Sequence, residues 1–250
     1  MKEIKKKQLW LILAVCCFLA VIIVSCIYIR GKNTTAQGTA LTVNGYSVAE
    51  EEFQMILSDY RSKVYSLYSS DEIHKESFWI TEYDGETPLK KIEGLAVEHL
   101  VRNKTIQKLS EKRGLTKKFS YSDIIEETKK ENAERKQAYD SGQAVYGMRS
   151  YEIDDYYKYL YSNMEAALIV DLIKNTIEVT EEECKTYYEE HKEMDAELQE
   201  GYEKTKSIIK RRIQDDKADA IIAKEIKKAK VNYDQKQLDR LALEVLTVQE

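Results

Sequence analysis

Glycine and proline are scarce in this chain, and their scarcity limits the possible folds more than any other feature. Only nine Gly and one Pro occur in 250 residues. β-Sandwiches, β-barrels and propellers need a turn residue about every ten positions, so the composition argues against them. Rossmann and P-loop domains use glycines in phosphate-binding loops, and the sequence contains neither glycine pattern. Abundant Lys, Glu, Ala and Leu favour a mainly α fold.

The apolar run at residues 9–29, LWLILAVCCFLAVIIVSCIYI, predicts an N-terminal transmembrane helix. Its 21 residues carry no charge. A helix of this length spans about 30 Å, the thickness of the hydrocarbon core of a bilayer. Lys5, Lys6 and Lys7 precede the run, so the positive-inside rule predicts a cytoplasmic N-terminus and an extracytoplasmic body. We expect a single-pass protein of a bacterial cell membrane.

The end of the same run allows a second interpretation. Ile23 to Cys26, IVSC, resembles a bacterial lipobox, which would make Cys26 a lipidation site after cleavage. The apolar run before Cys26 is longer than a usual signal peptide needs, and apolar residues continue to Ile29. We favour an uncleaved anchor and keep the lipoprotein as the alternative. Both interpretations tether the body to the outer face of a membrane.

The remaining residues divide into a short linker and one acidic body. Residues 1–30 form the anchor or lipoprotein signal, and residues 31–40, GKNTTAQGTA, are small and polar and predict a linker. Residues 31–250 hold 34 basic and 43 acidic side chains, a net charge of −9. An acidic body does not suit nucleic acid, because binding to phosphates needs the opposite sign of charge. We expect residues 41–250 to form a single helical domain.

Strand signals lie at opposite ends of this body. Leu41–Val43 alternates and runs into the turn signal Asn44-Gly45, and residues 230–233 alternate again. Isolated short strands are unstable, so we expect the two segments to pair with each other and close the domain. Ser47, with Glu50 three residues later, predicts the N-cap of a helix that begins near residue 48.

Other cap signals place further helices. Thr87-Pro88 predicts the start of one helix, Ser120 or Ser122 the start of a polar one, and Thr180 with Glu183 the start of another. The helix at about 150–175 has a broad apolar face, so we expect it at the centre of the core.

Three segments resemble the SurA and PrsA family of extracytoplasmic foldases. Residues 43–53, VNGYSVAEEEF, are similar to the opening motif of that family, and residues 179–192, VTEEECKTYYEEHK, to a later helix. Residues 227–233, KKAKVNY, resemble the closing segment. The three occur in the family's order and together cover roughly residues 40–243.

The resemblance implies a SurA-like helical chaperone domain that binds unfolded or exported polypeptides. Family members commonly carry a parvulin-type prolyl isomerase domain of about 90 residues after the second motif. Only a few residues follow Lys192 before the next predicted helix, and the parvulin signatures are missing. We therefore expect no prolyl isomerase catalysis and no enzyme activity. The alternative is a scaffold or accessory subunit of a cell-envelope or secretion assembly.

The chemistry-bearing side chains predict no catalytic residues, metal site or cofactor. His74, His99 and His191 lack partners at metal-ligand spacing. Cys184 and His191 lie two helical turns apart, about 10.5 Å, beyond hydrogen-bond reach.

The tyrosines are more informative, because the amphipathic ring suits binding of varied unfolded segments. Those in the helix at 150–175 cover too much of its circumference for all of them to face the core. Five tyrosines are the candidates for a client-binding groove: Tyr156, Tyr157, Tyr161, Tyr187 and Tyr188.

Overall fold

A computed structural model describes residues 38–247 of the chain. The predicted membrane helix at 9–29, the possible lipidation site Cys26 and the predicted linker up to residue 37 lie outside the described residues. Within residues 38–247, no helix combines the length and the apolar character that crossing a bilayer requires.

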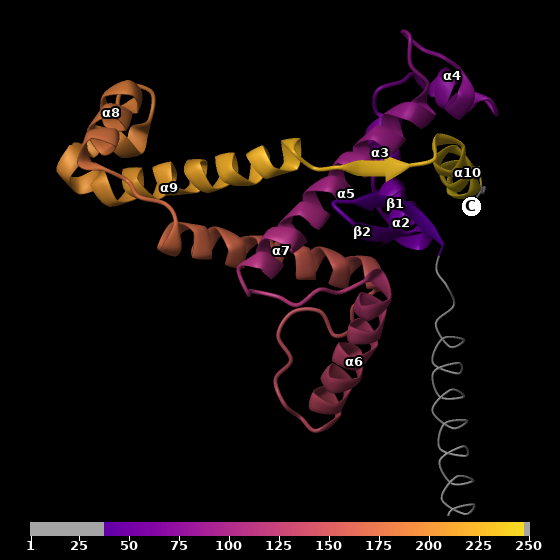
Figure 1. Cartoon of the computed structure of the whole chain (residues 1–250), viewed down its shortest axis with the longest axis horizontal. Helices are drawn as coiled ribbons and strands as arrows, with labels where there is room; N and C mark the ends of the chain where they lie inside the picture. The colour runs from indigo at the N-terminus through magenta and orange to yellow at the C-terminus, as the bar shows by residue number, and fades with distance from the viewer. Residues whose placement is uncertain (1–37, 248–250) are drawn as a thin grey trace, which may run out of the picture. The chain divides into compact units, whose positions relative to one another are not determined.

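Helices make up most of residues 38–247, so the prediction of a mainly α fold is confirmed (Figure 1). The α-helices are α2 (Glu50–Asp59), α3 (Arg61–Tyr65), α4 (Ser70–Ile73), α5 (Pro88–Lys112), α6 (Tyr121–Asp140), α7 (Ile153–Asn175), α8 (Glu181–His191), α9 (Tyr202–Lys227) and α10 (Gln235–Leu246). The strands are β1 (Thr39–Val43), β2 (Tyr46–Ala49) and β3 (Val231–Tyr233). The short 3-10 helices are η1 (Phe78–Ile80) and η2 (Ala196–Glu200).

A small antiparallel sheet joins the two ends of the described chain. β1 lies in the centre, between β2 and β3. Leu41 pairs with Tyr233 and Val43 pairs with Val231, so the predicted pairing of these segments is confirmed. The prediction of two strands is wrong, because β2 adds a third strand on the other side of β1.

The turn between β1 and β2 explains the additional strand. Asn44 and Gly45 have φ angles of 54° and 83°, left-handed values at both central positions of a two-residue hairpin. Such a turn folds the following residues directly back along β1, where their backbone groups find partners. Asn-Gly therefore starts a hairpin here rather than a helix.

The helix predicted from residue 48 consequently begins later. Ser47 lies in β2 opposite Thr42 and does not cap a helix. α2 begins at Glu50, and its N-cap, Ala49, forms no side-chain hydrogen bond. Residues 46–49 pair with β1 in the sheet, so their backbone groups find partners there and not in the first turn of a helix.

Three other predicted helix starts are confirmed. Thr87 accepts a hydrogen bond from the backbone N–H of Lys90, with Pro88 in the first helical position. Thr180 and Glu183 form the predicted capping box of α8. For α6, the choice between two serines falls on Ser120. These contacts span three residues, so the sequence alone can specify them.

The main core is built around α5. This helix packs against α2, α7, α9, α10 and β1, and it buries Ile92, Ala96 and Leu100. α7, which the sequence pattern predicts at the centre, instead packs against α5, α6 and α9. Tyr159 and Val170 of α7 are exposed, so this helix has a solvent face as well as a core face.

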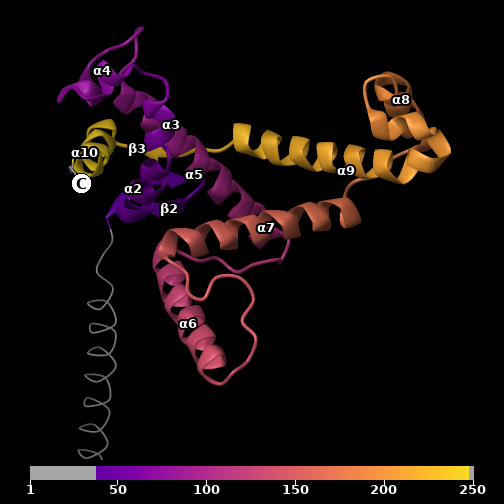
Figure 2. The ribbon, with the colours of Figure 1, turned by 180° about the vertical axis from the view of Figure 1, so that it is seen from behind.

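A smaller apolar cluster lies where α8, η2 and α9 pack together, and both ribbon views show α8 beside the end of α9 that is farther from the sheet (Figures 1 and 2). It contains Cys184, Leu198, Ile209 and Ile213. Further along α9, Ile222 belongs to the main core. α9 therefore takes part in both clusters.

Candidate functional site

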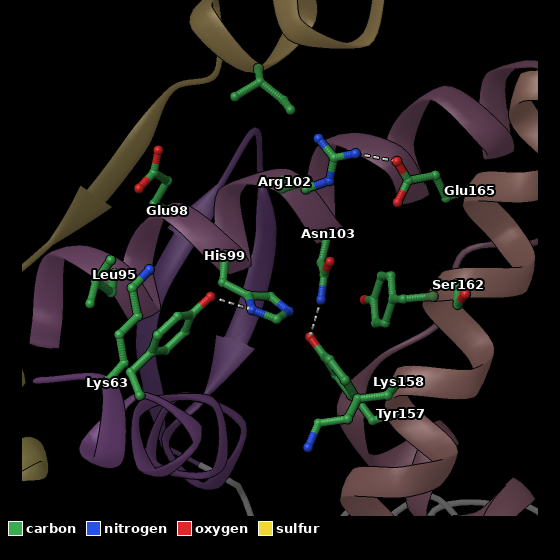
Figure 3. A pocket seen from close by; sticks show the side chains of 13 residues that line it. Lys63, Leu95, Glu98, His99, Arg102, Asn103, Tyr157, Lys158, Ser162 and Glu165 are labelled. Atoms are coloured by element: carbon green, nitrogen blue, oxygen red, sulfur yellow. Dashed lines mark hydrogen bonds and ion pairs between the residues drawn. The ribbon is translucent and has the colours of Figure 1, made fainter. Parts of the chain in front are cut away.

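A groove of ≈ 510 Å³ lies between α3, α5 and α7, next to the C-terminal end of α2 (Figure 3). We call it the interhelical groove. It combines apolar, aromatic and charged side chains. The lining residues are Tyr60, Lys63, Leu95, Glu98, His99, Arg102, Asn103, Tyr157, Lys158, Tyr161, Ser162, Glu165 and Ile226.

A buried ion pair lies next to the tyrosines that line this groove. Lys104 Nζ is 2.7 Å from Glu52 Oε1, and the two side chains are 1% and 0% exposed. The hydroxyl of Tyr157 donates a hydrogen bond of 2.9 Å to the same Glu52 oxygen. The pair joins α2 to α5, and Tyr157 joins α7 to both. Because a buried charge without its partner is costly, this network helps to fix the relative position of the three helices.

The same network extends along α5 and α7. Lys104 donates to the hydroxyl of Tyr161 at 3.2 Å, and that hydroxyl donates to Gln107 at 3.3 Å. Asn103 donates to the hydroxyl of Tyr157 at 3.2 Å. Burial by itself disfavours the charged form of Lys104, but Tyr161 and Glu52 raise its pKa above the ordinary value. Burial is also the largest cause of the raised pKa of Tyr157, which stays protonated.

His99 contributes a half-buried imidazole to the groove. Its Nδ1 lies 2.9 Å from the hydroxyl of Tyr60, and the two rings meet edge to face. Burial lowers the pKa of His99, so the imidazole is neutral at neutral pH. His99 and Ser162 therefore present neutral hydrogen-bonding groups to the groove.

Ion pairs cross the rim of the groove. Arg102 of α5 pairs with Glu165 of α7, as Figure 3 shows. Lys158 of α7 pairs with Asp59 of α2 at 3.0 Å. These pairs are partly exposed, so each contributes only a few tenths of a kcal/mol to at most about 1 kcal/mol.

The five tyrosines selected from the sequence lie in separate places. Tyr157 and Tyr161 line the interhelical groove but are almost entirely buried. Tyr156 is also buried, and it packs against Tyr151 and Tyr159.

The remaining two lie on α8. Tyr187 is half-buried and lines a second groove between α8 and α9. Tyr188 packs edge to face on Tyr202. The structure therefore does not bring the five side chains together on one surface, and their role in client binding stays a prediction.

Exposed aromatic and methionine side chains also occur at the end of α6, in the loop 141–152 and on α7. We call these side chains the tyrosine surface. Its members expose between 46% and 86% of their area, and they are Tyr139, Tyr146, Met148 and Tyr159. Figure 2 shows this loop running back beside α6.

Arginine and asparagine side chains hold the loop against α6. Arg135 donates hydrogen bonds to the carbonyls of Tyr146 and Met148 and lies over the ring of Tyr151 at 4.7 Å. Asn132 both donates to and accepts from the backbone of Tyr151. The loop thus presents its aromatic side chains from an ordered backbone.

The sequence pattern does not predict the tyrosine surface. Tyr139 and Tyr146 occur in the sequence without apolar neighbours at helical spacing, at the end of a polar helix and just after it. Large side chains among polar neighbours have no apolar partners to pack against, and this pattern could have drawn attention to residues 139–148.

The other chemistry-bearing side chains serve local contacts. His74 Nδ1 lies 2.6 Å from the carbonyl oxygen of Ser70, and His191 Nδ1 lies 2.8 Å from that of Tyr187. Cys184 is a buried free thiol in the α8–α9 cluster. Within residues 38–247, no group of His, Cys, Asp and Glu side chains is arranged to hold a metal ion.

Comparison with known proteins shows two similar chains. The chaperone for lacto-N-biosidase of Bifidobacterium longum subsp. longum is 26% identical over 116 residues, 46% of this chain and 41% of that protein. The foldase protein PrsA of Caldanaerobacter subterraneus subsp. tengcongensis is 23% identical over 177 residues, 70% of this chain and 49% of that protein. No protein-family model matches the sequence, and no solved structure matches it.

These similarities support a distant relationship to chaperones and foldases. They agree with the general part of the resemblance seen in the sequence motifs. The chain spans less than half the length of either relative.

Proposed function

We propose that this chain is a membrane-tethered extracytoplasmic chaperone of the SurA/PrsA type. It holds exported polypeptides through shallow aromatic contacts while they fold. The segment at residues 9–29 is the proposed tether, with lipidation at Cys26 as the alternative. Two relatives named as a chaperone and a foldase support the general activity.

The proposal that this chain binds client polypeptides rests mainly on the tyrosine surface. Tyr139, Tyr146, Met148 and Tyr159 leave large apolar areas in contact with water, which costs free energy unless a partner covers them. Tyr and Met also adapt to varied partners, because one carries a polar hydroxyl and the other a flexible thioether. A weak, sequence-tolerant surface of this kind suits the binding of many clients.

The proposal excludes prolyl isomerisation by parvulin chemistry. Ten residues, 192–201, separate α8 from α9. A parvulin domain of about 90 residues cannot fit in this connection.

Light scattering of a chemically unfolded client tests the proposal. The detergent-solubilised full chain should slow aggregation of several unrelated clients at near-stoichiometric amounts. A variant of the tyrosine surface, Tyr146→Ser, Met148→Ser and Tyr159→Ser, should lose most of this effect. The matched control is Leu67→Ser, Ile80→Ser and Val170→Ser, which removes similarly exposed apolar side chains elsewhere.

Each outcome has a distinct meaning. Equal loss in both triple variants would reject the tyrosine surface as the binding site. Failure to protect any of several clients, combined with tight binding of one envelope protein, would favour the scaffold or accessory subunit. Cis–trans isomerisation of a proline tetrapeptide should proceed at the same rate with the protein as in buffer alone. Isomerase activity that survives purification would contradict the expected absence of prolyl isomerase catalysis.

A further inference from the structure

A second groove, of ≈ 530 Å³, lies between α8 and α9, and we call it the acidic groove. Its apolar lining comes from Tyr187, Ile213 and Ala220. Carboxylates border this lining from both helices, and they are Glu182, Glu190 and Asp216.

All three of these carboxylates are exposed to solvent. Within residues 38–247, none of them forms an ion pair or a side-chain hydrogen bond with another residue. Lys217 also lines the groove, but it is bound to Glu183 at 2.5 Å and donates to the carbonyl of Glu178. The groove therefore keeps a net negative charge around an apolar floor.

The spacing of the charges sets the size of a matching ligand. Glu182 and Glu190 are eight residues apart on α8, which corresponds to about 12 Å along the helix axis. An extended peptide covers that length with about four residues. Asp216 approaches from α9, on the other side of the groove.

We propose that the acidic groove binds short polypeptide segments in which a large apolar side chain is flanked by lysine or arginine. A purely apolar segment would remove water from three carboxylates without replacing it, which costs free energy. Basic side chains beside the apolar one supply the missing partners, while the apolar side chain covers Tyr187 and Ile213. This proposal rests on the proposed chaperone function and names a class of client segment for it.

The test measures binding of a fluorescent 12-residue peptide that alternates lysine with leucine and serine. A matched peptide carries glutamate in place of lysine. The protein is the detergent-solubilised full chain, either unchanged or as Glu182→Lys, Glu190→Lys and Asp216→Lys. The control variant, Asp71→Lys, Glu76→Lys and Glu82→Lys, changes the net charge equally at exposed carboxylates outside the groove.

The lysine peptide should bind the unchanged chain more tightly than the glutamate peptide, and binding should weaken as salt rises. The groove variant should weaken binding about tenfold, and the control variant less than about threefold. Equal weakening in both variants, or equal binding of the two peptides, would overturn the assignment. So would self-association that only the groove variant abolishes, because the occupant would then be a second copy of the chain.

The aggregation assay separates this inference from the proposed function. Client protection that persists while the lysine peptide fails to bind would reject the acidic groove alone. Absence of both activities would reject the chaperone function as well. Circular dichroism of each variant verifies that the fold is retained before binding is compared.

Discussion

Replacing Lys104 by methionine should destabilise the domain strongly, although the side-chain length hardly changes. Methionine keeps most of the apolar stem, so the main loss is the charge that neutralises Glu52 in the core. Glu52 would keep one donor, the Tyr157 hydroxyl at 2.9 Å, and its Oε2 already has no partner within residues 38–247. Removing one member of a buried ion pair costs about 3–5 kcal/mol.

The size of the domain converts this cost into a measurable change in Tm. About 1 kcal/mol shifts the Tm of a domain of 150–250 residues by about 2–4 °C. K104M should therefore lower the Tm of residues 38–250 by about 6–20 °C. Thermal unfolding followed by circular dichroism, together with urea unfolding, gives the free energy change.

Two further variants isolate the charge effect. The double variant E52Q/K104M removes both charges, and it should recover to within about 2 kcal/mol of the unchanged protein. Lys112→Met alters an exposed lysine of the same helix and should change stability by less than about 0.5 kcal/mol. A K104M loss below about 1 kcal/mol, or a double variant no more stable than K104M, would refute the reasoning.

Three other predictions concern pH, the hairpin and the anchor. Burial raises the pKa of Glu93 from 4.5 to about 7, so the folded chain binds more protons than the unfolded chain between these values. Stability should therefore fall as pH rises from about 4.5 to 7, by at most about 3 kcal/mol, and E93Q should flatten this slope in a plot of Tm against pH. Asn44→Ala should cost about 1–3 kcal/mol in urea unfolding, because it loses the hydrogen bond from the backbone N–H of Lys230 and fits poorly at a φ of 54°. The intact mass of membrane-extracted protein should begin at Met1 without lipid, and a mass that begins at Cys26 with acyl chains would show cleavage.

Several parts of the fold could be predicted because neighbouring residues specify them. The scarcity of Gly and Pro indicated helices, and Thr87 and Thr180 marked helix starts through contacts with residues three positions later. The pairing of Leu41–Val43 with residues 230–233 could be predicted because two isolated strands would otherwise leave their backbone groups unsatisfied, and β3 forms it with residues 231–233.

The candidate site could not be predicted to the same extent. Tyr157 and Tyr161 are candidates for a client-binding groove in the sequence, yet a buried lysine and glutamate bind their hydroxyl groups in the core. Glu52 and Lys104 give no sign of this in the sequence, because charged residues on a helix ordinarily face water. Exposed tyrosines lie instead at the end of α6, on the loop that follows and on α7. Arg135 holds the backbone of that loop through two hydrogen bonds.

The sequence by itself determined the class of fold, three of the helix starts and the pairing of the two ends of the domain. The fold class and the helix starts depend on hydrogen bonds between residues a few positions apart and on the backbone conformations that Gly and Pro allow, and neither depends on how the helices pack. The tertiary structure alone decided that Glu52 meets Lys104, which tyrosines face solvent, and that α8 and α9 enclose an acidic groove. These features depend on which helix faces pack together, and burial and charge pairing follow from that packing rather than from any local pattern.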